Sequence, residues 1–204
     1  MLKHFLPTCE LNNIELVNRV DRLTINNIDK QRLLQFASYN KHMNSLVLRI
    51  CFCSNDKIVR KVTLQIFLSN HSAMCFTCHF KATMYRYLFS LLQSKYGVQV
   101  TLMKLCTSVW AYQLLCRVGD LGKFYSFLCK VTPYTIIDYT PELFPCVTIT
   151  FNSSESQTFA RIFHTGKVVL LGVRSLVQLG EVIPKLSGLF FDYSLQCNLD
   201  NFSN

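Results

Sequence analysis

The chain contains two stretches that share one pattern, a strand, a turn and a second strand that ends in Ile-Phe. The first stretch comprises residues 43–50 and 63–67, and the second comprises residues 139–145 and 159–172. The two copies lie about 95 residues apart in a chain of 204 residues. Because each copy of an internal repeat forms its core on the same plan, this repeat constrains the fold more than any single motif does.

Composition limits the class of protein. Hydrophobic residues make up 50% of the chain, which is enough for a sizeable core in one compact domain or two small ones. The formal net charge of +9 favours a polyanionic partner or an acidic protein surface. No run approaches the roughly 18 apolar residues of a membrane helix, so we expect no contact with a membrane.

The N-terminal residues and the cysteines together indicate the cellular compartment that we expect for the protein. The first ten residues lack the apolar run and the cleavage site of a secretory signal, so we do not expect export. The ten cysteines are then most simply reduced thiols in the cytosol or the nucleus.

Strand and helix patterns recur in the same order in both halves. The sequence predicts strands over residues 13–25 and 102–116, each followed by a short helix. The helix of the first half is expected over residues 29–38. In the second half the helix starts at Leu121, where apolar residues follow the i, i+3, i+4, i+7 spacing.

A longer helix is predicted at the end of each half, where apolar residues at helical spacing occupy 84–92 and 176–186. Gly97 is suited to end the first of these helices in a left-handed cap. Pro184 interrupts the second, so we expect a kink or a break there. The residues from 194 onward are polar and rich in Asn, which predicts a frayed C-terminal tail.

Alternation along the strands separates two faces in each half, because successive side chains of a strand point to opposite sides. One face is aliphatic throughout, as a face covered by helices requires, and it comprises Leu46, Leu48, Ile50, Leu64, Ile66, Val147, Ile149, Ala160, Ile162, Val168 and Leu170. The other face mixes aromatic, hydroxyl and basic side chains. Two antiparallel sheets follow, each with helices behind one face and the other face open, and joined edge to edge they would offer one broad open surface.

The residues at 139–172 resemble a known family. Residues 139–145 are similar to the stirrup loop of the TATA-box-binding protein (TBP) family, and the strand pair that follows it is matched by Ile162, Phe163, Gly166, Lys167 and Val169. Pro184 falls where that family has a proline in its last helix. The first half resembles the family's first repeat more faintly, through the residue pairs 13–14, 39–40, 49–50 and 66–67.

The resemblance implies an α+β fold class, a TBP-like saddle of two pseudo-symmetric repeats that form a curved antiparallel sheet with helices on the convex face. It places the first repeat at residues 8–100, the second at 101–193, and a polar C-terminal tail at 194–204. In the family the concave face sits on the DNA minor groove, where apolar side chains enter base steps and kink the duplex.

Site residues follow from the resemblance by position. The four apolar wedges fall on Met43 and Phe67 in the first repeat and on Phe144 and Phe163 in the second. One of the family's two central asparagines is matched by Asn13. The second has no Asn counterpart, and a count back from Tyr139 without a gap reaches the amide of Gln113.

Further contacts fall on the same face. Arg49 matches a phosphate-contacting arginine, while its repeat partner is Thr150. Val169 in the second repeat, with Cys75 and Thr77 in the first, is expected to form the apolar floor.

Two substitutions depart from the family pattern on the face that contacts DNA. Glu15 stands at an apolar floor position, where an unpaired carboxylate facing phosphates is costly. Arg161 stands at another, and an arginine in a narrow A·T-rich minor groove can be favourable. These substitutions affect sequence preference more than they affect the fold.

Other chemistries fit the sequence less well. Cys75 to His79 matches the haem-attachment pattern, and Cys51, Cys53, Cys75 and Cys78 together suggest a zinc site, but residues three apart on a strand point to opposite faces. Packed free thiols are the better interpretation, and we predict no metal site and no cofactor. The five histidines have no catalytic partner in local sequence, so we predict that the protein is not an enzyme.

The sequence therefore favours a transcription initiation factor that binds and bends A/T-rich promoter DNA through the minor groove and recruits initiation proteins. An alternative is a TBP-like adaptor that has lost DNA binding and acts as a protein-interaction module; Glu15, Met43 and Thr150 motivate it. A third interpretation, a basic sheet that stacks single-stranded bases on aromatics, is disfavoured because Phe67, Phe144 and Phe163 lie at strand ends.

The resemblance also implies partners and a location. Glu142 and Leu143 match stirrup positions that hold the IIB-type general transcription factor, and the RNA polymerase machinery is implied with it. The expected location is the nucleus, or wherever the transcription machinery of a host or virus works. The apolar concave face would allow the free protein to form a homodimer.

Overall fold

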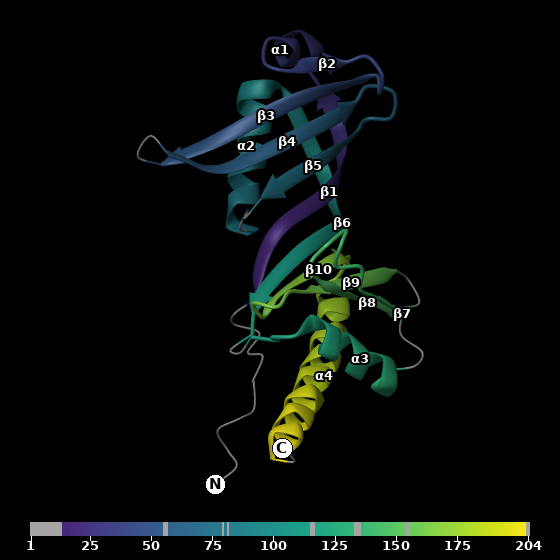
Figure 1. Cartoon of the computed structure of the whole chain (residues 1–204). Helices are drawn as coiled ribbons and strands as arrows, with labels where there is room; N and C mark the ends of the chain where they lie inside the picture. Colours follow the sequence, from purple (N-terminus) through teal and green to yellow (C-terminus); the bar gives the residue numbers. More distant parts are fainter. Residues whose placement is uncertain are drawn as a thin grey trace. The chain divides into compact units, whose positions relative to one another are not determined.

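The structure is a computed structural model that describes residues 14–54, 57–78, 80, 82–114, 117–132, 136–153 and 156–202. It divides into two compact units (Figure 1). The first unit is Leu16–Ser108, and the second is Val109–Asn204 together with the start of the chain up to Glu15. Each unit is described by itself.

The same order of elements occurs twice. The first unit contains β1 (Glu15–Ile28), α1 (Lys30–Leu34), β2 (Ser38–Asn40), β3 (Ser45–Ser54), β4 (Lys57–Phe67), β5 (Ser72–Cys78) and α2 (Ala82–Tyr96). The second order comprises β6 (Val98–Gln113), α3 (Leu121–Val131), β7 (Ile136–Asp138), β8 (Val147–Asn152), β9 (Gln157–Ile162), β10 (Lys167–Val173) and α4 (Leu176–Phe202). This repetition confirms the predicted α+β class built from two repeats.

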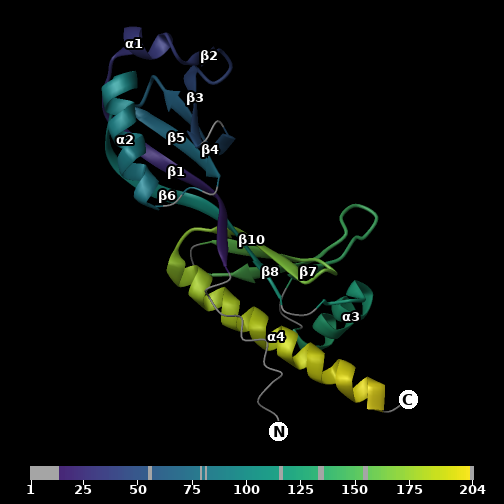
Figure 2. The ribbon, with the colours of Figure 1, turned by 90° about the vertical axis from the view of Figure 1, so that its left-hand side faces the viewer.

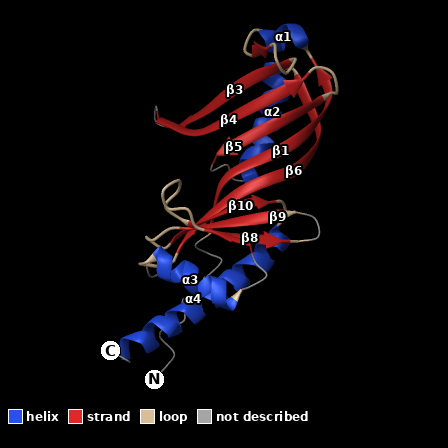
Figure 3. Ribbon diagram, turned by 45° about the vertical axis from the view of Figure 1, so that its right-hand side comes forward, coloured by secondary structure: helices blue, strands red, loops and turns tan. Residues whose placement is uncertain are grey.

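Each unit has two layers, an antiparallel sheet and helices on one of its faces (Figures 2 and 3). The strand order in the first unit is β2-β3-β4-β5-β1-β6, and in the second it is β6-β10-β9-β8-β7. The strand β6 begins in the first unit and ends in the second. We call the sheet face opposite the helices the open face of each unit.

The predicted aliphatic face forms the core of both units. Its members are buried, and in register Leu46 lies opposite Ile66 while Val147 lies opposite Ile162. Helices α1 and α2 cover this face in the first unit through Leu33, Leu88 and Leu92; α3 and α4 cover it in the second through Phe124, Leu128, Leu179 and Leu186.

Local sequence sets the helix ends. Asp29 and Asp120 cap α1 and α3, their carboxylates accepting backbone N–H groups of the first turn. Gly97 follows α2 with φ +66°, and a Cβ there would lie 2.6 Å from the Cβ of Asp29. The predicted left-handed end of this helix is therefore confirmed, and only glycine fits at that position.

The break expected at Pro184 and the frayed tail expected from residue 194 are both wrong, whereas a kink at Pro184 stays a prediction. Pro184 does not break α4, and the helix continues through residues 194–202, for which we expected a frayed polar tail. A proline inside a helix removes one backbone hydrogen bond, and its ring crowds the carbonyl four residues earlier, so contacts outside the helix backbone must hold the helix there. Val182, Ile183 and Leu186 are buried around the proline, and this packing holds the helix on both sides.

A buried carboxylate, paired with a partly exposed arginine, ties β1 to its neighbours in the first unit. Asp21 has no exposed surface, and its carboxylate accepts Nε–H of Arg19 at 2.8 Å and the hydroxyl of Tyr85, on α2, at 2.8 Å. Thr77 of β5 lies 3.2 Å from the same hydroxyl. Burial and the neighbouring carboxylate raise the pKa of Tyr85, so it remains a neutral donor.

We expect Asp21→Asn to lower the free energy of unfolding by about 3 kcal/mol, because it leaves the Arg19 cation with no buried counter-charge. Urea unfolding followed by circular dichroism measures the change, with the exposed Asp192→Asn as the matched control. A loss of less than about 1 kcal/mol would show that the pair is no stronger than a surface ion pair.

Candidate nucleic-acid interface

The open face of the first unit is made of rows that cross four strands. In one row Val47, Gln65, Met74 and Arg22 lie side by side on β3, β4, β5 and β1. The next row comprises Arg49, Thr63, Phe76 and Val20. All of these side chains are exposed or half-buried, so the face is accessible and carries two arginines.

The predicted floor residues of β5 lie on the wrong side. Cys75 and Thr77 are buried on the helix-covered face, and Met74 and Phe76 stand on the open face instead. The reason is the register, since Ala73 pairs with Ile66 and continues the core face along β5. A count across the β4–β5 turn from Ile66 would have found Met74 and Phe76 from the sequence.

The open face of the second unit contains the second set of predicted site residues. Thr148, Arg161 and Val169 form one row across β8, β9 and β10. The next row is Thr150, Phe159 and Leu171. Arg161 is exposed and Val169 is half-buried, whereas Thr150 is buried although it belongs to this face.

An aromatic pair stands at one end of the open face in the second unit. The rings of Phe144 and Phe163 meet edge to face, with centroids 6.0 Å apart. The guanidinium carbon of Arg161 lies 5.0 Å from the Phe144 centroid, within cation–π range. Phe144 is 46% exposed, so a large apolar ring is held at the surface by two neighbours.

At the corresponding end of the first unit, the side chain that contacts the apolar residue of the turn is uncharged. Met43 is exposed in the turn before β3, and Gln65 donates its amide N–H to the Met43 sulfur at 2.9 Å and to Ser45 Oγ at 3.1 Å. Phe67 is half-buried at the end of β4 and lies opposite Ser45. Ser45 itself is buried, because Gln65 covers it.

The remaining predicted residues are exposed or lie outside the described residues. The amide of Gln113 donates to the carbonyl of Thr165 at 2.8 Å, in the turn between β9 and β10. Glu15 is exposed at the first position of β1. Asn13 lies outside the described residues.

The turn before β8 presents the predicted partner residues. The carbonyl of Thr140 accepts the backbone N–H groups of Leu143 and Phe144, both at 3.0 Å. Glu142 is exposed, and Leu143 is 83% exposed, so an aliphatic side chain points into solvent with its backbone fixed. This arrangement suits a protein contact.

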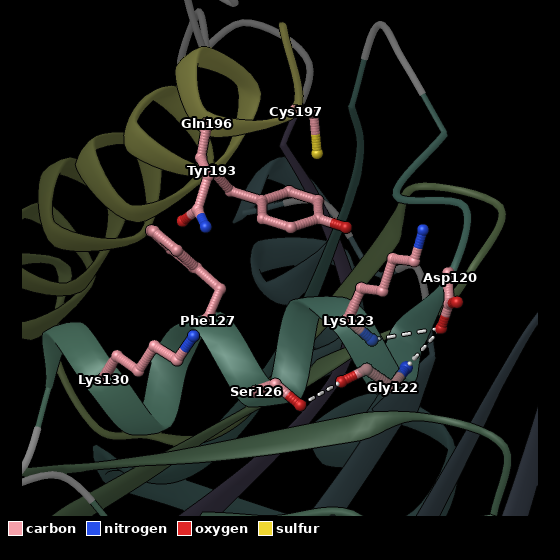
Figure 4. A pocket seen from close by; sticks show the side chains of 9 residues that line it. All are labelled: Asp120, Gly122, Lys123, Ser126, Phe127, Lys130, Tyr193, Gln196 and Cys197. Atoms are coloured by element: carbon pink, nitrogen blue, oxygen red, sulfur yellow. Dashed lines mark hydrogen bonds between the residues drawn. The ribbon is translucent and has the colours of Figure 1, made fainter. Parts of the chain in front are cut away.

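A pocket of about 440 Å³ lies on the helical side of the second unit, between α3 and the C-terminal part of α4 (Figure 4). Phe127 and Tyr193 line it, with ring centroids 5.4 Å apart, and Lys123 and Lys130 stand at its two ends. The carboxylate of Asp120 is already occupied by the backbone N–H groups that it caps. The pocket lining therefore carries two lysines and one carboxylate, and the carboxylate caps α3.

Thiols do not gather into a metal site among the described residues. Cys51, Cys53 and Cys78 are exposed, whereas Cys75 is buried on the other face of its strand. No group of three or more potential ligands that could hold a metal ion occurs in the part of the chain that the structure describes. Within the same residues, no helix is long and apolar enough to span a membrane.

Comparisons with known proteins agree with this geometry. A family model described as transcription factor TFIID (or TATA-binding protein, TBP) matches residues 128–193. Among solved structures, the TBP of Methanococcus jannaschii matches with a TM-score of 0.66 and 23% sequence identity, over 88% of this chain and 99% of that chain. No curated protein matches in sequence.

The fold of two repeated units, each with an open sheet face, is therefore the TBP-like fold, and the family match in the second unit gives it sequence support. The likeness to the solved TBP shows the fold, and residues 128–193 match the TBP family model, in agreement with the resemblance noted from the sequence.

We expect iodoacetamide at pH 8 to alkylate Cys78 in the native protein and to leave Cys75 unmodified until the protein unfolds. Burial raises the pKa of the Cys75 thiol to about 12, so its thiolate is scarce in the folded state. The stability that this neutral thiol contributes is present below its ordinary pKa and is lost as pH rises toward 12. Mass spectrometry of peptides measures both sites, and equal rates would place Cys75 on the open face.

Proposed function

We propose that this protein is a transcription initiation factor that binds and bends A/T-rich promoter DNA through the minor groove. The observation that carries the proposal is the exposed Phe144 ring beside Phe163 at the end of a sheet face that also carries arginine and lysine. Apolar wedges at a sheet end unstack base steps, and bases are then read through contacts in the groove.

The charges of the two open faces suit a duplex backbone. Arg22 and Arg49 lie on the face of the first unit, and Arg161 and Lys167 are exposed in the second. Neutralised phosphates release counterions, so binding should weaken steeply with salt. The minor-groove edge of A·T pairs carries acceptors without the amino group of guanine, which favours A/T-rich sites for a mostly apolar surface.

The protein partners in this proposal are a IIB-type general transcription factor and the polymerase machinery, and the location is the nucleus or another site of host or viral transcription. Glu142 and Leu143 are the proposed contact, because both are exposed on a turn whose backbone is fixed. For the free protein, a homodimer that covers the apolar parts of the open faces belongs to the same proposal.

We expect Phe144→Ala and Phe163→Ala each to weaken binding to an A/T-rich duplex by roughly tenfold and to reduce its bend, because the unstacked base step loses its apolar filler. Energy transfer between dyes at the two duplex ends measures the bend, and a titration measures the affinity.

The matched control is Phe36→Ala, which removes an exposed ring that packs on Tyr96 of the helical side. A duplex in which I·C pairs replace A·T pairs keeps the minor-groove acceptors and should still bind. Absence of binding to any duplex at low salt would refute the proposal. Preference for single strands over duplex would instead favour base stacking, for which Phe76 and Phe159 are exposed rings within the sheets.

The alternative is a TBP-like adaptor without DNA binding, and the pocket between α3 and α4 is the observation that favours it. Lys123 and Lys130 flank a pocket with aromatic walls, which suits an acidic segment with an aliphatic side chain. Lys130 follows Lys123 by seven positions along α3, so the two lysines lie roughly 10 Å apart along its axis, the reach of a short peptide.

Under the adaptor alternative, Lys123→Glu with Lys130→Glu should weaken binding of a fluorescein-labelled peptide of alternating Glu and Leu by about tenfold. Fluorescence anisotropy measures the affinity. The pair Lys30→Glu with Lys185→Glu gives the same net charge at exposed positions outside the pocket. Equal weakening by both pairs would indicate charge attraction alone and would remove the support for docking.

A further inference from the structure

The two units place a polar side chain at the same repeat position. Gln65 immediately precedes Ile66, which lies opposite Leu46, and Arg161 immediately precedes Ile162, which lies opposite Val147. The register therefore makes Gln65 and Arg161 equivalent.

The apolar residues that they contact are equivalent as well. Met43 lies three residues before Leu46, and Phe144 lies three residues before Val147. Gln65 donates to the sulfur of Met43, and Arg161 stacks on the ring of Phe144. In each unit, one side chain on the second strand of the hairpin thus contacts the exposed apolar residue in the turn before the first strand.

The two contacts differ in charge, because the first is an amide with a thioether and the second is a guanidinium with an aromatic ring. No ion pair neutralises Arg161 among the described residues. Asp138 lies in the same row two strands away, roughly 9–10 Å across the sheet, and its carboxylate accepts the hydroxyl of Thr140. The thiol of Cys146 lies close enough for the Arg161 charge to act on it, but its pKa is raised by burial, so it remains neutral.

We propose that Gln65 and Arg161 are positioning residues whose difference in charge sets the direction in which the protein lies on DNA. The inference rests on the proposed function. The Arg161 end of the second unit selects the narrower and more negative stretch of an A/T-rich minor groove. The Gln65 end of the first unit takes the wider and more flexible stretch.

The physical reason lies in the groove. A-tracts are stiff and have a narrow minor groove with a strong negative potential that attracts arginine, whereas T-A steps are flexible and are unstacked easily. The stack on Phe144 restricts the guanidinium before binding, so less side-chain entropy is lost when it enters the groove. Gln65 has no charge, and the thioether of Met43 adapts its shape.

The experiment uses the full chain and a duplex with an A-tract at one end of the binding window and alternating T-A steps at the other. A photo-crosslinking residue, p-benzoylphenylalanine, is introduced at Leu143 in one protein and at His42 in another. These exposed positions are equivalent in the two repeats, since each directly precedes the apolar residue of its turn. Sequencing of the crosslinked DNA identifies the end that each unit occupies.

With Gln65 and Arg161 in place, we expect the Leu143 reporter to mark the A-tract end about fivefold more than the other end, and the His42 reporter to show the reverse. The double variant Gln65→Arg with Arg161→Gln keeps the composition and the net charge, and it should invert both ratios. Gln65→Arg alone should bring the ratios close to one and steepen the salt dependence by about one phosphate contact.

An orientation that the exchange leaves unchanged would overturn the inference while duplex binding still supports the proposed function. If the protein with Gln65 and Arg161 in place does not bind the duplex, the inference and the proposed function are both overturned. If circular dichroism shows that the double variant does not fold, the single variant Gln65→Arg tests the inference. An unchanged crosslinking ratio in that variant also refutes the role of charge at this position.

Discussion

The burial of aliphatic side chains that face each other across the two hairpins is the interaction on which the rest of the structure depends. Leu46 with Ile66 and Val147 with Ile162 have almost no exposed surface, and the helices pack on them. Because strand side chains alternate, a slip of one residue would carry Ile66 to the open face and Gln65 into the core. The core therefore decides which residues are available for binding, although none of its own members is exposed.

The sequence predicted the fold correctly where apolar and polar residues alternate clearly along a strand. The hairpin strands alternate cleanly, so their core faces were predictable. Prediction failed on β5, where the larger apolar residues Met74 and Phe76 lie outward and the small residues Cys75 and Thr77 lie inward. The resemblance had placed Cys75 and Thr77 on the floor of the open face, and only the pairing of β5 with β4 shows that they face the helices.

Sequence similarity alone was enough to assign the predicted wedges to the sheet ends. The side chains that contact these wedges could be identified only from the strand register. Nothing local indicates that Arg161 stacks on Phe144 or that Gln65 reaches Met43, because each pair is separated by a loop and depends on the offset of two strands. The same limit applies to Pro184, where a proline that breaks an isolated helix is held by packing on both sides. Tertiary contacts decided each of these cases.

The two units keep one plan in the core and differ on the open face, and this division explains how so divergent a chain retains its fold. The match to the archaeal TBP reaches a TM-score of 0.66 at 23% identity. An exchange between amide and guanidinium at the position of Gln65 and Arg161 leaves the strand register intact, since the side chain points away from the aliphatic face. Residues on the open face can therefore change charge without a cost in core packing, and binding can diverge faster than architecture.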